Sequence, residues 1–136
     1  MKKLNILIAA SEVVPFAKSG GLADVAGALP KALRHLGHDV RIVMPRYYII
    51  DKDQYNLKPI PGSLGVPMGS MGEIWCSVFE GVLPGTDVPV YFIEHEEFFG
   101  RKELYDKDGE GFPDNDNRFI FFSIDQIRLQ DVKYLY

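Results

Sequence analysis

Two apolar runs that flank one amphipathic stretch constrain the fold of this chain more than any other feature. The first run extends from Leu4 to Ala10, and the second extends from Val40 to Met44. A continuous apolar run is typical of a central parallel strand that is covered on both faces. Two such strands joined by a helix form the crossover unit of a doubly wound sheet. The sequence therefore predicts an α/β fold with a Rossmann-like, doubly wound, mostly parallel sheet.

The stretch between the two runs has the pattern of a helix that begins near Leu22. Its apolar residues recur on one helical face: Leu22, Val25, Ala26, Leu29, Leu33 and Leu36. Pro30 lies inside this pattern and predicts a kink or a break. Gly37 follows the last apolar position and is well placed to end the helix as a C-cap.

The remainder of the chain is less regular. Arg46 to Gly72 is predicted to be a loop with at most one short strand, because it contains several prolines and glycines. Glu73 to Leu83 and Val88 to Glu94 are predicted to be two strands joined by a turn. Glu94 to Asn117 is polar and predicts a long surface excursion, and spacing typical of a helix returns from Asn117 onward.

Length and charge argue against several kinds of protein. With 136 residues the chain supplies one domain at most. Its net charge of −4, without any run of basic residues, argues against nucleic-acid binding, which rests on clustered Lys and Arg. No apolar stretch approaches the roughly 20 residues that a membrane helix needs.

The N-terminus and the cysteine content indicate the compartment. Leu4 to Ala10 is short for the apolar core of a signal peptide, and Asn5 interrupts it, so we favour a strand. The single cysteine, Cys76, forms no internal disulfide, which fits a reducing compartment. We therefore expect a cytoplasmic protein.

The segment Lys18-Ser19-Gly20-Gly21 lies between the first predicted strand and the predicted helix. A strand, a glycine loop and a helix N-terminus hold anions well, because backbone N–H groups can approach a phosphate closely. The helix dipole adds partial positive charge, and the Lys18 ammonium adds a full one. Ligands of doubly wound sheets bind at the carboxyl ends of the strands, where this loop would lie. The segment therefore predicts a site for a phosphate-bearing ligand, in the first place a nucleotide.

This segment is not one of the standard nucleotide-binding fingerprints. Neither G-x-x-x-x-G-K-[ST] nor G-x-G-x-x-G occurs. On the residues alone, Gly20-Gly21 is equally well explained as a flexible turn before a helix. Asp24, in the first helical turn, is either a ligand contact or a favourable partner of the helix dipole. Glu12 follows the end of the first strand, so we expect it to face the same crevice.

The string SEVVPFAKSGGLADVAGALP, from Ser11 to Pro30, resembles the start of the bacterial glycogen synthases and plant starch synthases. The family pattern is S-E, a proline a few residues on, K-x-G-G-L and A-D-V-x-G-A-L-P, and every element is present. Further segments extend the resemblance to Ser123: Leu36 to Val40, Met44-Pro45, Val90 to Ile93, Phe98-Phe99, Arg101, Leu104-Tyr105, Phe112 to Asn115, Arg118-Phe119 and Phe121 to Ser123. The pattern then weakens, and the family's H-x-H-D-W strand and C-terminal domain do not occur in these 136 residues.

The resemblance implies a GT-B fold, with residues 1–136 as part of its N-terminal domain and the donor-binding C-terminal domain outside this chain. It implies a retaining glucosyltransferase that moves glucose from ADP-glucose to the non-reducing end of an α-1,4-glucan, without a cofactor or a metal. Lys18 would be the catalytic residue that neutralises charge on the departing diphosphate. The donor site would also include Ser19, Gly20, Gly21, Asp24 and Glu12. Because both domains must close around the donor, we expect the isolated chain to be inactive.

Four further residues match family positions near the rim of the cleft, where the resemblance implies a role in acceptor binding: Tyr105, Asp114, Asn115 and Arg118. Aromatic faces with flanking carboxylates and amides suit carbohydrate ligands. Tyr105 is equally able to pack its own loop, and Asp114 or Asn115 to cap the following helix. No metal site is predicted, because the histidines are not grouped and adjacent residues such as Glu94 to Glu97 cannot all point one way.

Two other functions remain open on the sequence. One is a non-catalytic module that binds a nucleotide sugar or a glucan, and the other is a different GT-B glucosyltransferase that uses UDP-glucose. A partial sheet would also leave open strand edges and apolar surface. We therefore expect self-association, or partial disorder between Ile124 and Tyr136.

Overall fold

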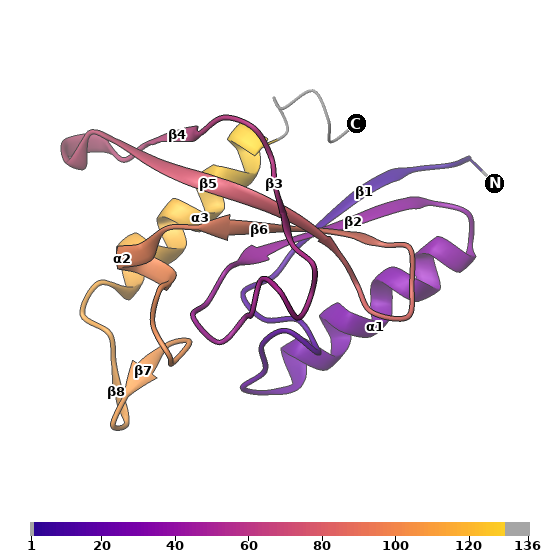
Figure 1. Ribbon diagram of the computed structural model, residues 1–136, viewed down its shortest axis with the longest axis horizontal. Coiled ribbons are helices and arrows are strands. Elements are labelled where there is room, and N and C mark those ends of the chain that lie inside the picture. The colour runs from indigo at the N-terminus through magenta and orange to yellow at the C-terminus, as the bar shows by residue number, and fades with distance from the viewer. Residues whose placement is uncertain (1, 130–136) are drawn as a thin grey trace.

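A six-stranded sheet organises the fold (Figure 1). The computed structural model describes residues 2–129, and the strand order in the sheet is β1-β2-β6-β5-β3, with β4 paired to β5. Three neighbouring strands are parallel, namely β1 (Asn5–Ala9), β2 (Asp39–Pro45) and β6 (Pro89–Glu94). Antiparallel pairing extends the sheet through β5 (Glu73–Val82), β3 (Lys58–Pro59) and β4 (Leu64–Pro67). The predicted α/β fold with a Rossmann-like parallel core is confirmed.

The most buried parallel strands are β2 and β6. Ile42 to Pro45 of β2 and Val90 to Ile93 of β6 are buried, whereas the residues of β1 are exposed or half-buried. Within residues 2–129 β1 is the first strand of the sheet order, and the expected covering of both its faces is not seen in this part of the chain. An apolar run indicates that a strand can be buried, but strand order is set by long-range pairing that the run does not encode.

The helix α1 (Gly21–His35) packs on the sheet with small residues rather than with its leucines. Its buried residues are Ala23, Ala26, Gly27 and Pro30, and its exposed apolar residues include Leu22, Val25 and Leu29. A Cβ atom on Gly27 would lie 2.9 Å from the carbonyl oxygen of Val14. The small face therefore lets the loop after β1 run close against the helix.

The predicted end of this helix is confirmed. Gly37 has a φ of +98°, a conformation that favours glycine, and its N–H donates to the carbonyl of Arg34 at 2.9 Å. Pro30 lies inside α1, which continues on both sides of it, so the predicted break does not occur.

The strands predicted on either side of residues 84–87 are confirmed as β5 and β6. The segment predicted to hold at most one short strand holds two, β3 and β4, and the short helix η1 (Gly69–Met71). The predicted excursion contains α2 (Glu96–Phe99), β7 (Asp106–Lys107) and β8 (Glu110–Gly111), and it leads into α3 (Asn115–Leu129). This excursion is not wholly at the surface, because Phe98 and Phe99 are buried.

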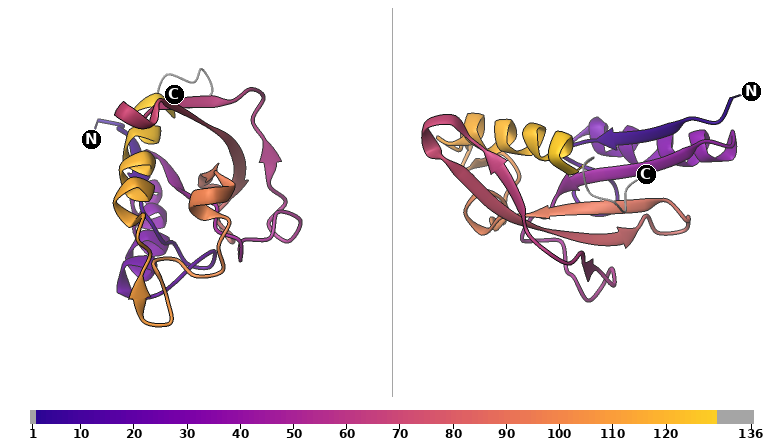
Figure 2. Two further views of the ribbon diagram at one scale, coloured as in Figure 1. Left: turned by 90° about the vertical axis from the view of Figure 1, so that its left-hand side faces the viewer. Right: turned by 90° about the horizontal axis from the view of Figure 1, so that it is seen from above.

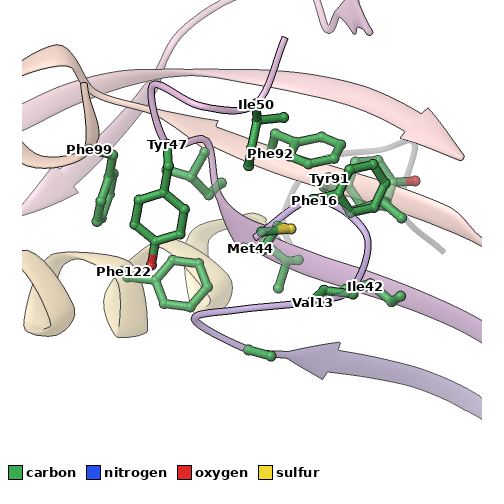
Figure 3. Close-up of a cluster of buried hydrophobic side chains, with 14 of the residues drawn as sticks. Val13, Phe16, Ile42, Met44, Tyr47, Ile50, Tyr91, Phe92, Phe99 and Phe122 are labelled. Carbon is green, nitrogen blue, oxygen red and sulfur yellow. The ribbon is translucent and has the colours of Figure 1, made fainter. Parts of the chain in front are cut away.

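Aromatic rings hold together the segments that leave the carboxyl ends of the parallel strands (Figure 3). Phe16, in the loop after β1, lies edge-on to Phe92 of β6, with 5.0 Å between the ring centroids. Tyr47, which follows β2, lies edge-on to Phe99 of α2 at 6.0 Å. Such pairs bury large apolar surfaces in a defined geometry, so they fix where the loops beyond these strands lie.

The two long helices lie at different ends of the molecule (Figure 1, Figure 2). α1 contacts β2, and α3 contacts β4 at the far end of the antiparallel extension. Among residues 2–129, no helix is long and apolar enough to cross a membrane. The expectation of disorder between Ile124 and Tyr136 lies largely outside the described residues, which end at residue 129.

Candidate functional site

The loop of residues 10–20 lies at the carboxyl end of β1, where ligands of open α/β sheets bind (Figure 1). It is compact, because the N–H groups of Phe16 and Ala17 both donate to the carbonyl of Val13, at 2.9 and 3.0 Å. The N–H of Val14 donates to the carbonyl of Ala23 at 3.1 Å, which ties the loop to the first turn of α1. Lys18 to Gly20 therefore stands directly before the helix and Gly21 is its first residue, so the loop lies at the helix N-terminus as the sequence predicts.

Lys18 and Asp24 form an ion pair at the surface of this site. The Lys18 Nζ atom lies 2.9 and 3.0 Å from the two carboxylate oxygens of Asp24. Both side chains are more than half exposed, at 54% and 56%. An exposed pair of this kind contributes about 1 kcal/mol or less. The phosphate of a ligand can therefore replace Asp24 as the partner of Lys18 at little cost.

Glu12 is buried behind the loop and holds it in shape. Its carboxylate accepts hydrogen bonds from the N–H of Ser19 at 3.1 Å and the N–H of Gly20 at 2.9 Å. It also accepts from the hydroxyls of Ser19 and Tyr105, both at 2.6 Å. The sequence predicted that Glu12 faces the crevice. Only 3% of its surface is exposed, so it does not. It faces inward because the loop's own donors converge on it.

The protonation of Glu12 reflects these bonds. Burial alone would raise the pKa of the carboxyl, but the hydrogen bonds from Ser19, Tyr105 and Gly20 outweigh burial and lower the pKa to about 2. Glu12 is therefore ionised at neutral pH. The loop closes around an internal anion, and charge-assisted bonds of this type are stronger than bonds between neutral groups.

The two glycines leave open space in front of the helix. A Cβ atom on either Gly20 or Gly21 would meet no other atom within 4 Å. The fold around them therefore does not require glycine for lack of room. The N–H of Gly20 is already bonded to Glu12, so what glycine provides for an anion is the exposed backbone of Gly21 at the start of α1.

Tyr105 joins the loop to the segment before β7. Its hydroxyl lies 2.6 Å from Glu12 and 2.7 Å from the Ser11 hydroxyl, and the Tyr47 hydroxyl donates to the Ser11 carbonyl at 2.6 Å. Burial and the bond to Glu12 raise the pKa of Tyr105 to about 12. Ser11 and Tyr47 are members of this network that sequence reasoning missed. Tyr47 follows the end of β2 by two residues, and this position at the carboxyl end of a parallel strand could have indicated a place near the site.

The other residues predicted for the rim lie in or next to the segment that carries Tyr105. Asn115 donates from Nδ2 to the Tyr105 carbonyl at 2.8 Å, and Asp114 pairs with Arg101, with 2.8 Å between Nη1 and Oδ1. Arg118 is fully buried and donates to the carbonyls of Phe98 at 2.6 Å and Leu104 at 2.9 Å. The expectation that Arg118 lies on the rim is therefore wrong. Its guanidinium lies among aromatic rings, including that of Phe112, and braces the segment that carries Tyr105.

Within the part of the chain that the structure describes, no group of three or more His, Cys, Asp or Glu side chains is arranged to hold a metal ion. The charged groups at the loop are Lys18, Asp24 and Glu12, and they form the contacts given above.

The parallel core, together with an anion-type loop and a helix N-terminus at the carboxyl end of its first strand, defines a Rossmann-like ligand-binding domain. The family model of the starch synthase catalytic domain matches residues 5–131. The chain belongs to the starch synthase catalytic domain family.

Similar proteins agree with this assignment. Glycogen synthase 1 of Geobacter metallireducens is 63% identical over 123 residues, which are 90% of this chain and 24% of that protein. A glycogen synthase of Treponema denticola is 51% identical over 117 residues, 85% of this chain and 23% of that protein. The catalytic domain of starch synthase IV from Arabidopsis thaliana, bound to ADP and acarbose, superimposes with a TM-score of 0.80 at 30% identity, covering 94% of this chain and 25% of that one. The chain thus spans about a quarter of the length of these relatives.

Proposed function

We propose that this chain is part of the N-terminal domain of a retaining glycosyltransferase that moves glucose from ADP-glucose to the non-reducing end of an α-1,4-glucan. The observation that carries the proposal is the position of Lys18, an exposed cation at the N-terminus of α1 on a loop that Glu12 fixes from behind. The names of the relatives, glycogen synthase and starch synthase, support the reaction. The ADP in the related starch synthase structure supports the adenine nucleotide. The cytoplasm is the compartment that this function implies.

Lys18 acts on the leaving group. When the bond between glucose and the diphosphate breaks, negative charge grows on the diphosphate, and a cation placed at that point stabilises the transition state. Lys18 exchanges Asp24 for the phosphate, and the N-terminus of α1 adds partial positive charge. Glu12 and Tyr105 act one layer behind, because they hold the backbone that carries Lys18 and do not themselves reach the ligand.

The reaction needs a second domain. Residues 1–136 supply one wall of the donor site, and in this proposal a C-terminal domain holds most of the nucleotide sugar. Productive geometry arises only when both walls close on the donor. The 136-residue chain alone is therefore expected to transfer no glucose from ADP-glucose to glycogen.

The test uses a full-length protein that carries this N-terminal sequence. Lys18→Ala should lower kcat by about 10²–10³-fold, the range for removal of one preorganised electrostatic contact. Lys58→Ala, which removes an exposed lysine of β3, is the matched control and should leave kcat unchanged. Normal transfer by the Lys18→Ala enzyme would refute the proposed role.

The alternatives make different predictions in the same assay. A UDP-glucose enzyme would turn over UDP-glucose faster than ADP-glucose. A non-catalytic binding module would bind nucleotide sugar or glucan with no turnover at either donor, even when the full-length protein is used.

A further inference from the structure

A groove on the antiparallel part of the sheet is separate from the Lys18 loop. Its volume is about 450 Å³, and its lining includes Trp75 and Ser77 of β5 together with Ser63, which precedes β4. The other wall is formed by His95, at the end of β6, and by the first residues of α2. In Figure 1 the β4–β5 hairpin extends away from the loop that precedes α1. No residue of that loop lines the groove.

Trp75 is a flat aromatic surface that faces solvent. It is 59% exposed, although a large apolar ring of this kind is usually buried. Its pairing partner on β4 is Gly65, and a Cβ atom at that position would lie 2.5 Å from the Glu73 carboxylate and 3.0 Å from the indole ring. Glycine on the neighbouring strand thus makes room for the side chains of both Glu73 and Trp75, and more than half of the Trp75 surface remains accessible.

The groups around Trp75 can both donate and accept hydrogen bonds. The Nδ1 atom of His95 accepts from the N–H of Phe98 at 3.2 Å, so the neutral imidazole carries its proton on Nε2 and can donate it. Burial lowers the pKa of His95, which favours this neutral form. The exposed carboxylates of Glu96 and Glu97 accept hydrogen bonds, and the hydroxyls of Ser63 and Ser77 do both.

These features select one class of ligand. A pyranose ring has an apolar C–H face that stacks on an indole and equatorial hydroxyls that donate and accept at its edge. The exposed carboxylates of Glu96 and Glu97 at the same groove repel anions, whereas the carboxylate of Glu94 is paired with Lys52 at 2.7 Å, so a nucleotide or a sugar phosphate is disfavoured. The groove therefore suits an uncharged carbohydrate and not the donor substrate.

We infer that the Trp75 groove binds a segment of α-glucan at a distance from the reacting chain end. The choice of an α-glucan as the ligand rests on the proposed function, because the enzyme would extend this neutral polymer. The existence of the groove does not rest on it. Its role is to hold one part of a long acceptor while another part reaches the Lys18 site, which raises the local concentration of chain ends.

The first experiment uses the fact that Trp75 is the single tryptophan of the 136 residues. Titration of this chain with maltohexaose should give a saturable change in tryptophan emission. Calorimetry with Trp75→Ala should show binding weakened by about tenfold or more, as expected for loss of an aromatic contact. Tyr48→Ala, which removes an equally exposed ring from another cavity, is the matched control and should bind as the parent chain does.

Three results would overturn the inference. They are no response to maltohexaose, calorimetric binding that survives in Trp75→Ala, and an equal response to the β-linked cellohexaose. The Lys18→Ala chain should keep the fluorescence response, because Lys18 is not part of the groove.

The second experiment keeps the inference testable in the full-length protein. Trp75→Ala should raise the KM for glycogen by several-fold and leave the KM for ADP-glucose and the rate on maltohexaose unchanged. A change in the KM for ADP-glucose with none for glycogen would contradict the groove. Because Lys18→Ala tests transfer and Trp75→Ala tests glucan affinity, failure of one proposal is distinguishable from failure of the other.

Discussion

At the scale of single residues, the loop of this site is organised around Glu12. Backbone N–H groups before a helix are often free to bind an external anion. Those of Ser19 and Gly20 instead donate to the carboxylate of Glu12, an anion within the protein. What remains for a ligand is the Lys18 ammonium and the backbone at the start of α1. Glu12 is thus a positioning residue, and Lys18 is the group that meets the substrate in the proposed reaction.

Glu12→Gln should destabilise the chain by about 1–3 kcal/mol at pH 7, since a charged acceptor is lost while its buried donors remain. The folded pKa of about 2 lies below the ordinary value of 4.5, so ionised Glu12 contributes fully above pH 4.5. This contribution is lost as the pH falls toward 2. Urea denaturation of both proteins between pH 2 and pH 7 should therefore show a gap in unfolding free energy that closes at low pH.

Glu110→Gln is the control for this measurement, because Glu110 is an exposed carboxylate of β8. It should leave the unfolding free energy unchanged. Equal stability of Glu12→Gln and the parent chain at pH 7 would show that the carboxylate does not hold the loop.

The sequence predicted the place of Lys18 but not the role of Glu12. Lys18 to Gly21 lies between a strand pattern and a helix pattern, both of which are local and readable. Glu12 has two partners nearby in the chain, Ser19 and Gly20, but its third partner, Tyr105, lies 93 residues further along the chain. Arg118 was misplaced for a similar reason, since its burial depends in part on the rings of Phe99 in α2 and Phe112 in the segment before α3. Local patterns do not encode such pairings.

At the scale of elements, α1 is the informative case. The apolar spacing predicted the helix and Gly37 predicted its end, but the leucine face is not the buried face. The buried face of α1 is the one that lets the loop after β1 pack closely against the helix. That approach requires small side chains, and it is visible only when loop and helix are seen together.

Gly27→Ala tests this close approach. Alanine favours a helix over glycine by about 1 kcal/mol, but its Cβ would lie 2.9 Å from the Val14 carbonyl oxygen. Forcing backbone apart in a packed region costs about 1–3 kcal/mol, so we expect net destabilisation in urea denaturation. Gly21→Ala has open space around it and should keep or slightly raise stability. A Gly27→Ala chain as stable as Gly21→Ala would contradict tight packing at this point.

At the scale of the whole molecule, the described part of the chain carries an uncovered apolar surface. Leu22, Val25 and Leu29 are 52%, 59% and 44% exposed on one side of α1, and β1 stands first in the sheet order. Exposed apolar side chains on one helix face favour association, because each contact removes apolar area from water.

The isolated chain is therefore expected to self-associate. Sedimentation velocity at rising protein concentration should show oligomers, and the double variant Val25→Lys/Leu29→Lys should shift the chain toward the monomer. Ile49→Lys changes a similarly exposed side chain in the loop after β2 and should have little effect. A parent chain that stays monomeric over the whole range would show that this surface does not drive association.

The hydrogen bond between Glu12 and Tyr105 also sets an order of events during folding. Its two ends are 93 residues apart, so the loop is synthesised long before its partner leaves the ribosome. Joining such distant segments costs chain entropy. The pairing of β2 with β6 must therefore form first, because it brings the two segments close together and offsets this cost. The loop around Lys18 should thus gain its final shape among the last steps, and pulsed hydrogen exchange at the Ser19 and Gly20 amides would follow this. A partly folded chain would then contain Lys18 without the ordered loop that places its ammonium group for phosphate binding.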